Sequence, residues 1–206
     1  MITLYWCPKT RASRILWLLE EMNEPFEVRK IDIRKAEEKE DPGFRAASPM
    51  GKVPAIEDRR EDAVIRMADS SAIALYLADR YPASGLAPAI DSPLRGDYLY
   101  WMTYTPGVIE PAMMEKFNQW EVSRATSGWG NFDTMIEVLE ARLSNREWLV
   151  GETFSAADVL VGSSVYFMKL FGALPDNPVL HAYVERCLAR PAYAKALGRD
   201  DELDDQ

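Results

Sequence analysis

The feature that most constrains the fold is a stretch in which two short apolar runs precede a capped apolar helix. The runs at residues 53–58 and 63–67 have the length and composition of β-strands, and the polar tetrapeptide between them fits a hairpin connection. Asp69 and Ser70 come directly before an apolar helical run and are residue types that cap helices. The free N–H groups of a helix start can hold a carboxylate. The stretch therefore predicts an antiparallel strand pair followed by a helix that can bind an anion.

The residues before this stretch predict a strand, a helix and a second strand. Residues 2–6 are apolar and predict a buried strand, and the helix expected at 11–22 carries its apolar residues on one face. Residues 26–33 alternate apolar and polar side chains, which predicts a second strand parallel to the first. Residues 34–44 are charged and contain proline and glycine, so we expect a surface loop with at most a short helix. The order βαβ followed by ββα is that of the thioredoxin-like fold.

A change of composition after this region marks a domain boundary. Residues 82–93 contain three prolines and a glycine and are interpreted as a linker. Residues 1–81 then form the thioredoxin-like domain, and residues 94–206 form a helical domain. The predicted fold is an α/β thioredoxin-like N-terminal domain followed by an all-α C-terminal domain.

The helical domain has three recognisable segments. A long aromatic-rich helix over residues 94–117 must bend or break at Pro106 and the glycine after it. Residues 131–143 show a second apolar helical face. Ser155 with Asp158 three residues later forms the pattern of a capping box, which predicts the start of a buried helix.

Composition limits the class of protein. The 206 residues are 48% hydrophobic and 28% charged, which is typical of a globular protein with a substantial core. The net charge of −9 argues against binding to nucleic acid or to anionic membranes. No apolar run is long enough to span a bilayer, and one histidine with two distant cysteines predicts no metal site. We expect a protein of the reducing cytoplasm.

The motif Gly-Lys-Val-Pro, followed by Asp-Ser at a matching spacing, resembles the glutathione-binding half of the cytosolic glutathione S-transferases. The resemblance implies that the residue before a cis-proline pairs with the backbone of glutathione and that the acidic-Ser pair holds its γ-glutamyl end. It extends over nearly the whole chain, because the segment at 154–158 resembles the capping segment of the family's helical domain. The implied glutathione-binding residues are Lys52, Val53, Pro54, Asp69 and Ser70.

The chemistry of glutathione fits these residue types. Glutathione is an extended peptide with two carboxylates and one ammonium group, so a strand edge can pair with its backbone and Asp69 can bind the ammonium. Lys52 can reach the glycine carboxylate. The alternative is an ordinary hairpin followed by an N-capped helix, which the Asp-Ser pair also indicates.

The turn after the first strand offers two kinds of catalytic group. Cys7 with the proline after it resembles the Cys-Pro turn of omega-class transferases and of glutaredoxins, which implies a mixed disulfide with glutathione. A helix start and the nearby Lys9 and Arg11 are expected to favour the thiolate of Cys7. Thr10 and Ser13 lie near the place where serine-type classes carry a hydroxyl that stabilises the glutathione thiolate. Cys7 can also be a small buried turn residue without reactivity.

Three functions therefore remain open. The first is conjugation of glutathione, as co-substrate, to a small apolar electrophile, with Tyr104 as a candidate for the pocket that binds it. The second is a thiol reductase or deglutathionylase that works through Cys7. The third is a catalytically silent relative that uses the same surface to bind a protein. The resemblance also implies a homodimer.

Overall fold

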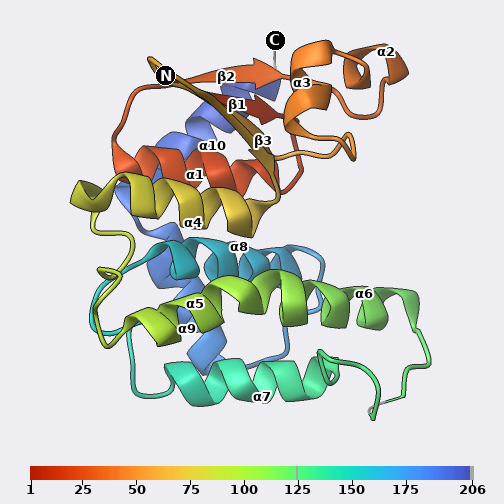
Figure 1. The fold of residues 1–206 in the computed structure, drawn as a ribbon. Helices are drawn as coiled ribbons and strands as arrows, with labels where there is room; N and C mark the ends of the chain where they lie inside the picture. The colour runs from red at the N-terminus through yellow and green to blue at the C-terminus, as the bar shows by residue number, and fades with distance from the viewer. Residues whose placement is uncertain (124, 205–206) are drawn as a thin grey trace. The chain divides into compact units, whose positions relative to one another are not determined.

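The computed structural model describes residues 1–123 and 125–204, and for residues 201–204 it gives only the course of the helix. The chain forms two compact units, and Figure 1 colours their elements by residue number. The first unit comprises Met1–Ser84 and Arg190–Gln206, and the second comprises Gly85–Ala189.

The first unit is built on a four-stranded sheet. Its elements are β1 (Ile2–Trp6), α1 (Ala12–Met22), β2 (Phe26–Lys30), α2 (Ala36–Lys39), α3 (Pro42–Ala47), β3 (Ala55–Arg59), β4 (Val64–Ala68), α4 (Ser70–Arg80), η1 (Pro82–Ser84) and α10 (Pro191–Asp204). The strand order is β2-β1-β3-β4, with β1 parallel to β2 and both other pairs antiparallel. This confirms the predicted thioredoxin-like order and the predicted hairpin.

The core of the first unit lies between the sheet and the helices α1 and α4, which share one side of it (Figure 1). Ile2, Leu4 and Trp6 of β1 are at most 1% exposed, because alternate residues of a strand point to the same face. The apolar stripe predicted for α1 is buried as well, and Ile15 and Leu16 have no exposed surface. This packing fixes the end of β1 and the start of α1 relative to each other.

The segment predicted as a loop after β2 holds two short helices, α2 and α3. Asp41 caps α3 by accepting a hydrogen bond from the Phe44 N–H at 2.8 Å. Pro42 occupies the first turn, where a missing N–H costs nothing, so the proline starts a helix instead of interrupting one. Phe44 is fully buried and ties α3 to the sheet.

The C-terminal helix α10 packs against α1 in the first unit. The ring of Tyr193 meets that of Trp17 edge-on, with centroids 5.3 Å apart, and Arg190 forms two hydrogen bonds with Glu21. The predicted boundaries placed all of residues 94–206 in one helical domain. Local sequence patterns do not show which surface α10 covers.

The second unit is entirely helical, as predicted. Its elements are α5 (Arg95–Tyr104), η2 (Thr105–Ile109), α6 (Glu110–Asn118), α7 (Phe132–Leu143), α8 (Ala156–Leu170) and α9 (Pro178–Leu188). The interruption expected at Pro106 is the π-helical turn η2, in which the Glu110 N–H bonds to the carbonyl of Thr105. Pro106 has no N–H to donate, and the wider turn accommodates the proline without breaking the helix.

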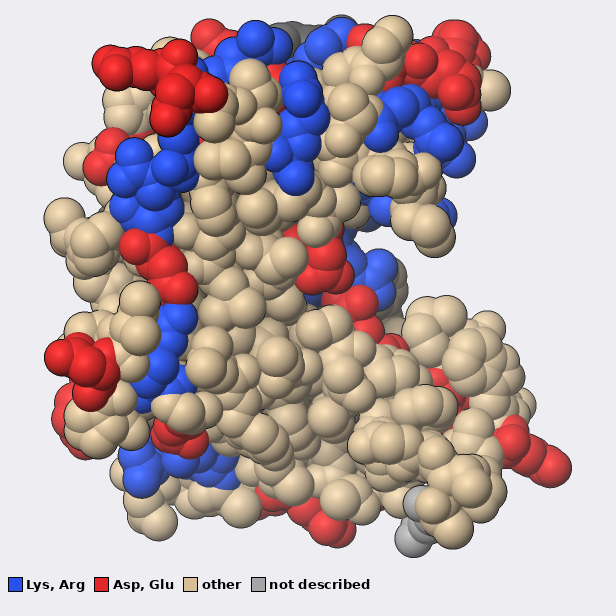
Figure 2. Space-filling model, in the orientation of Figure 1, with Lys and Arg blue, Asp and Glu red and all other residues tan. Residues whose placement is uncertain are grey.

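Charge is distributed unevenly over the surface. On the face shown in Figure 2, basic and acidic side chains are interspersed over the first unit, and much of the second unit is uncharged. Within the described residues, none of the helices combines the length and apolar character that a membrane span requires. Exposed apolar side chains of the second unit include Met114, Phe117, Trp120, Leu170 and Phe171.

The predicted capping box at the start of α8 centres on Asp158, which is completely buried. One carboxylate oxygen accepts from the Leu149 N–H at 2.9 Å and from the Tyr183 hydroxyl at 3.0 Å. The other accepts from both the N–H and the hydroxyl of Ser155, at 2.9 and 3.0 Å. Burial raises the pKa of Asp158 to about 6, although its four hydrogen bonds act in the opposite direction.

We predict that Asp158 makes the protein more stable as the pH falls from 7 to 4. The folded state binds the proton more tightly than the unfolded state, whose pKa is near 3.8. The free energy of unfolding of the wild type, relative to that of Asp158→Asn, should therefore decrease by roughly 2–3 kcal/mol between pH 4 and pH 7. Urea denaturation of both proteins across this range measures the difference.

Glu137→Gln, on the exposed face of α7, controls for the loss of one carboxyl group at the surface. A difference between wild type and Asp158→Asn that rises with pH would show that the hydrogen bonds outweigh burial and would contradict the prediction.

Candidate functional site

The candidate site begins in the turn between β1 and α1. The Thr10 hydroxyl donates to the carbonyl oxygen of Cys7 at 2.7 Å and accepts from the Ala12 N–H at 3.2 Å. It thereby joins the end of the strand to the first N–H groups of the helix. Lys9 lies in the left-handed region with a φ of 58°, which is uncommon for a residue other than glycine. The turn holds the Thr10 hydroxyl at the N-terminal end of α1.

Ser13, the other candidate hydroxyl, is engaged elsewhere. It donates to both carboxylate oxygens of Asp200 in α10, at 2.9 and 3.1 Å. The structure therefore brings Thr10 and Cys7 together in the turn and places the Ser13 hydroxyl against the C-terminal helix. Because Asp200 lies 187 residues further along the chain, the local sequence gives no sign of this contact.

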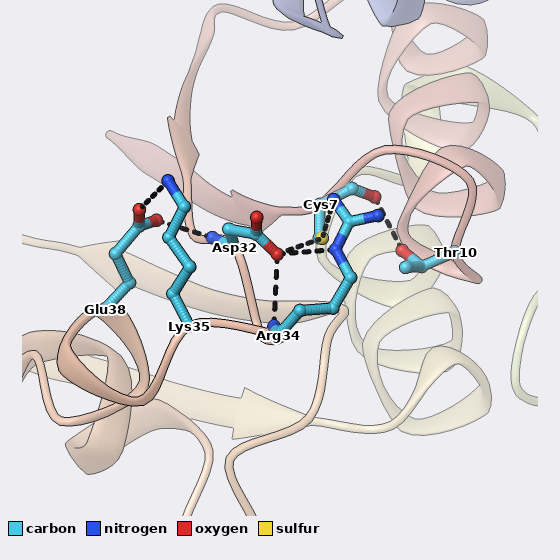
Figure 3. Close-up of polar contacts among 6 residues, drawn as sticks. All are labelled: Cys7, Thr10, Asp32, Arg34, Lys35 and Glu38. Carbon is cyan, nitrogen blue, oxygen red and sulfur yellow. Dashed lines mark hydrogen bonds and ion pairs between the residues drawn. The ribbon is translucent and has the colours of Figure 1, made fainter.

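The Cys7 thiol is enclosed by the segment that follows β2 (Figure 3). Its sulfur lies 4.0 Å from a carboxylate oxygen of Asp32 and 4.0 Å from the guanidinium of Arg34. It also accepts from the backbone N–H of Ile33. Only 1% of Cys7 is exposed.

This environment raises the pKa of the Cys7 thiol, so the prediction of a lowered pKa was wrong. Burial is the largest cause, and the carboxylates of Asp32 and Glu38 add to it, whereas the Ile33 N–H and Arg34 act against it. Helix α1 begins only at Ala12, so the thiol does not lie at the helix start that was expected to stabilise the thiolate.

Residues 32–38 form a self-contained network of ion pairs next to the thiol (Figure 3). Asp32 accepts from both the backbone N–H and the Nε of Arg34, at 3.1 and 2.7 Å. Glu38 accepts from the Asp32 N–H at 2.6 Å and from Lys35 at 2.9 Å. These bonds lower the pKa of Asp32 and of Glu38. The sequence predicted residues 32 and 33 at the end of the second strand and residues 34–44 as a charged surface loop with at most a short helix. The position of this segment over Cys7 was not predicted.

The Val53–Pro54 motif lies immediately before β3. The peptide bond between the two residues is cis, which confirms that prediction. The Ser48 hydroxyl accepts from the Lys52 N–H at 2.9 Å and donates to the Lys52 carbonyl at 2.7 Å, which fixes the approach to the motif. In the described part of the chain, we find no hydrogen bond to the backbone N–H or carbonyl of Val53. Its backbone is therefore available to an extended peptide.

The Asp-Ser pair forms the start of α4, as predicted. One oxygen of the exposed Asp69 carboxylate accepts from the Ser71 and Ala72 N–H groups, at 2.9 and 3.2 Å. The second oxygen forms no hydrogen bond with the described residues, and so it can receive a ligand ammonium. Asp69 has a φ of 80°, and left-handed backbone at a non-glycine residue is often found at functional sites. Ser70 is buried beside it, with 6% exposed.

Tyr104 lies within an aromatic cluster of the second unit. Its ring packs on Trp101 and Tyr100, with centroid distances of 4.9 and 5.5 Å. Burial raises the pKa of its phenol, and only 4% of the residue is exposed. Tyr100 is 51% exposed and presents the open side of the same cluster.

A metal centre is not indicated by the side chains present. Among residues 1–123 and 125–204, no group of three or more His, Cys, Asp and Glu side chains is arranged to hold a metal ion.

Comparison with known proteins identifies related sequences over both units. Residues 6–80 match the family described as glutathione S-transferase, N-terminal domain, and residues 109–191 match the glutathione S-transferase, C-terminal domain. The chain is 28% identical to the disulfide-bond oxidoreductase YfcG of Escherichia coli, over 96% of this chain and 94% of that protein. It is also 28% identical to glutathione S-transferase F13 of Arabidopsis thaliana, over 89% of each.

A solved structure supports the same relationship. The sphingomonad glutathione S-transferase complexed with glutathione has a TM-score of 0.76 and 27% identity to this chain, covering 97% of this chain and 98% of its own. The two sequence matches together span most of both units, and this structural match spans nearly the whole chain. The chain belongs to the glutathione S-transferase family.

Proposed function

We propose that the protein is a glutathione transferase that conjugates glutathione to a small apolar electrophile. The proposal rests on the different surroundings of two side chains, Thr10 and Cys7, in the turn between β1 and α1. The Thr10 hydroxyl stands at the start of α1, whereas the Cys7 thiol is buried and has a raised pKa. A thiol in this state is a poor nucleophile, and a hydroxyl at a helix start is suited to stabilise a bound thiolate.

The first unit offers a binding partner for each part of glutathione. The backbone of Val53 pairs with the peptide, and the second oxygen of Asp69 accepts from the γ-glutamyl ammonium. Ser70, at the start of α4, receives the γ-glutamyl carboxylate, and Lys52 receives the glycine carboxylate. Support comes from the position of these residues before β3 and α4, and from the relative solved with glutathione.

The chemical step follows from the hydrogen bonds of Thr10. Its hydroxyl keeps the Ala12 N–H as a donor and redirects its own O–H from the Cys7 carbonyl to the glutathione sulfur. The glutathione thiol loses its proton to solvent water, and the resulting thiolate attacks the electrophilic carbon. A carbon–sulfur bond forms while the leaving group departs with the bonding electrons. The exposed apolar side chains of the second unit, with Tyr100 at the open side of the Tyr104 cluster, suit an apolar second substrate.

A Cys7-dependent reductase is the second candidate. One relative, at 28% identity, is named a disulfide-bond oxidoreductase. In this reaction the Cys7 thiolate attacks a disulfide, forms a mixed disulfide and releases the other thiol as a thiolate. The segment over Cys7 has to move before this step is possible, because the sulfur is enclosed by residues 32–34.

The family relationship also leads us to propose a homodimer in the cytoplasm. Neither Cys7 nor Cys187 forms a disulfide with the described residues, which fits a reducing compartment. The third candidate, a catalytically silent binding protein, differs in having neither activity. Retention on immobilised glutathione, followed by assays with a panel of electrophiles and disulfides, distinguishes the three.

We predict that Asp69 has two separable roles. Asp69→Asn keeps a cap oxygen and a residue that tolerates left-handed backbone, but it loses the charge for the ammonium. Glutathione binding should weaken by about 1.5–3 kcal/mol, or roughly 10- to 150-fold in Kd, with an unchanged melting temperature. Asp69→Ala should lose affinity and also stability. Calorimetric titration and thermal melts measure both.

Wild-type affinity in Asp69→Asn would contradict the ammonium role and leave Asp69 as a helix cap only. Glu61→Gln, in the exposed hairpin connection, is the matched control for loss of one surface charge.

A second prediction separates the two chemistries. Thr10→Val should lower the kcat of conjugation by about 100- to 1,000-fold, which is the loss typical of removing one donor to a developing anion. Thr10→Ser, which keeps the hydroxyl, should retain most of the activity. Cys7→Ser should leave conjugation nearly intact. Steady-state kinetics with a chromogenic electrophile provide the measurement.

The opposite pattern would favour the reductase. Loss of activity in Cys7→Ser, together with a glutathione adduct mapped to Cys7 after exposure to oxidised glutathione, would overturn the assignment to Thr10. If glutathione is attached to neither cysteine, the result agrees with the assignment to Thr10.

A further inference from the structure

We propose that Asp200, near the end of the chain, is a positioning residue for the catalytic turn; this rests on the proposed role of Thr10. Its carboxylate accepts from the Trp6 indole N–H at 2.6 Å and from the Ser13 hydroxyl at 2.9 and 3.1 Å. Trp6 is the last residue of β1, and Ser13 is the second residue of α1. One carboxylate thus holds both ends of the turn that carries Cys7 and Thr10.

The turn requires such support because its backbone is strained. Lys9, in its middle, has a φ of 58°, and left-handed backbone at a residue with a side chain persists only where the surroundings enforce it. Two hydrogen bonds within the turn involve the Thr10 hydroxyl, and a longer one runs from the Ser13 N–H to the Thr10 carbonyl at 3.3 Å. When this hydroxyl redirects its proton to glutathione, the bond to the Cys7 carbonyl is lost. The contacts made by Asp200 remain in place at that moment, because neither passes through Thr10.

The two residues that donate to Asp200 are themselves held in place by the fold. Trp6 is completely buried, and its indole N–H has one direction in which to donate. Ser13 is part-buried and lies on the side of α1 that faces α10. Hydrogen bonds to a carboxylate are stronger than those between neutral groups. The contacts of Asp200 with Trp6 and Ser13, which we call the Asp200 clamp, therefore oppose displacement of either end of the turn.

Helix α10 is attached to α1 by other contacts as well. Arg190 bonds to Glu21 and Arg199 bonds to Glu20 at 2.7 Å, in the second half of α1. The guanidinium of Arg199 also lies 4.3 Å from the centre of the Phe26 ring. Removal of the Asp200 carboxylate should therefore leave α10 docked while freeing the turn. Arg199→Ala is the matched control, because it breaks an attachment of the same helix away from the turn.

The test compares Asp200→Ala, Asp200→Asn and Arg199→Ala. Asp200→Ala should lower kcat/KM for conjugation at least 10-fold and move the acid limb of its pH profile to higher pH, because a displaced Thr10 hydroxyl stabilises the thiolate less. Asp200→Asn retains an oxygen acceptor and should recover most of the activity. Arg199→Ala should stay within about two-fold of the wild type and keep its pH profile, even if it melts at a lower temperature.

Amide hydrogen exchange of the peptide covering residues 7–13 gives a second readout that does not depend on activity. Exchange should accelerate in Asp200→Ala and stay at the wild-type rate in Arg199→Ala. Equal exchange in the two variants, or a loss of activity in both that follows their melting temperatures, would overturn the clamp. If the wild type conjugates no electrophile, the proposed function fails, and the exchange measurement alone still decides whether Asp200 holds the turn.

Discussion

The site depends on the connection between the end of a buried strand and the start of a buried helix. Trp6 and Ala12 have no exposed surface, so the packing of β1 and α1 against each other fixes both ends of the turn. Only five residues bridge them, and the Thr10 hydroxyl links the two ends by bonding to Cys7 and to Ala12. The oxygen of a hydroxyl held in this way is already in position for a ligand, and only its O–H bond has to turn from the Cys7 carbonyl to the ligand.

Burial distinguishes the two candidate catalytic groups of this turn. Cys7 and Thr10 are three residues apart, but the segment after β2 covers the sulfur and leaves the hydroxyl part-exposed. Removing a thiolate from water is costly, and the nearest charges include a carboxylate as well as a guanidinium. This difference in burial is why we propose that the protein stabilises the thiolate of a bound ligand and does not generate one at Cys7.

Much of this arrangement could be predicted from local patterns. The strand at Ile2–Trp6, the cap at Asp69 and the capping box at Asp158 follow from periodicity and cap chemistry within a few residues. The raised pKa of Cys7 could not be predicted in this way. Asp32 and Arg34 lie some 25 residues away and become neighbours of Cys7 only through the parallel pairing of β1 with β2. The packing of α10 on α1 is equally invisible, since an amphipathic pattern does not name the surface that a helix covers.

The central claim is that the sulfur of glutathione meets the Thr10 hydroxyl and not the Cys7 thiol. A crystal structure of the protein with glutathione tests it most directly. The account predicts the ligand sulfur within about 3.5 Å of the Thr10 oxygen, with Cys7 unmodified beneath residues 32–34. Continuous density between the ligand sulfur and the Cys7 sulfur, at about 2.05 Å, would contradict it.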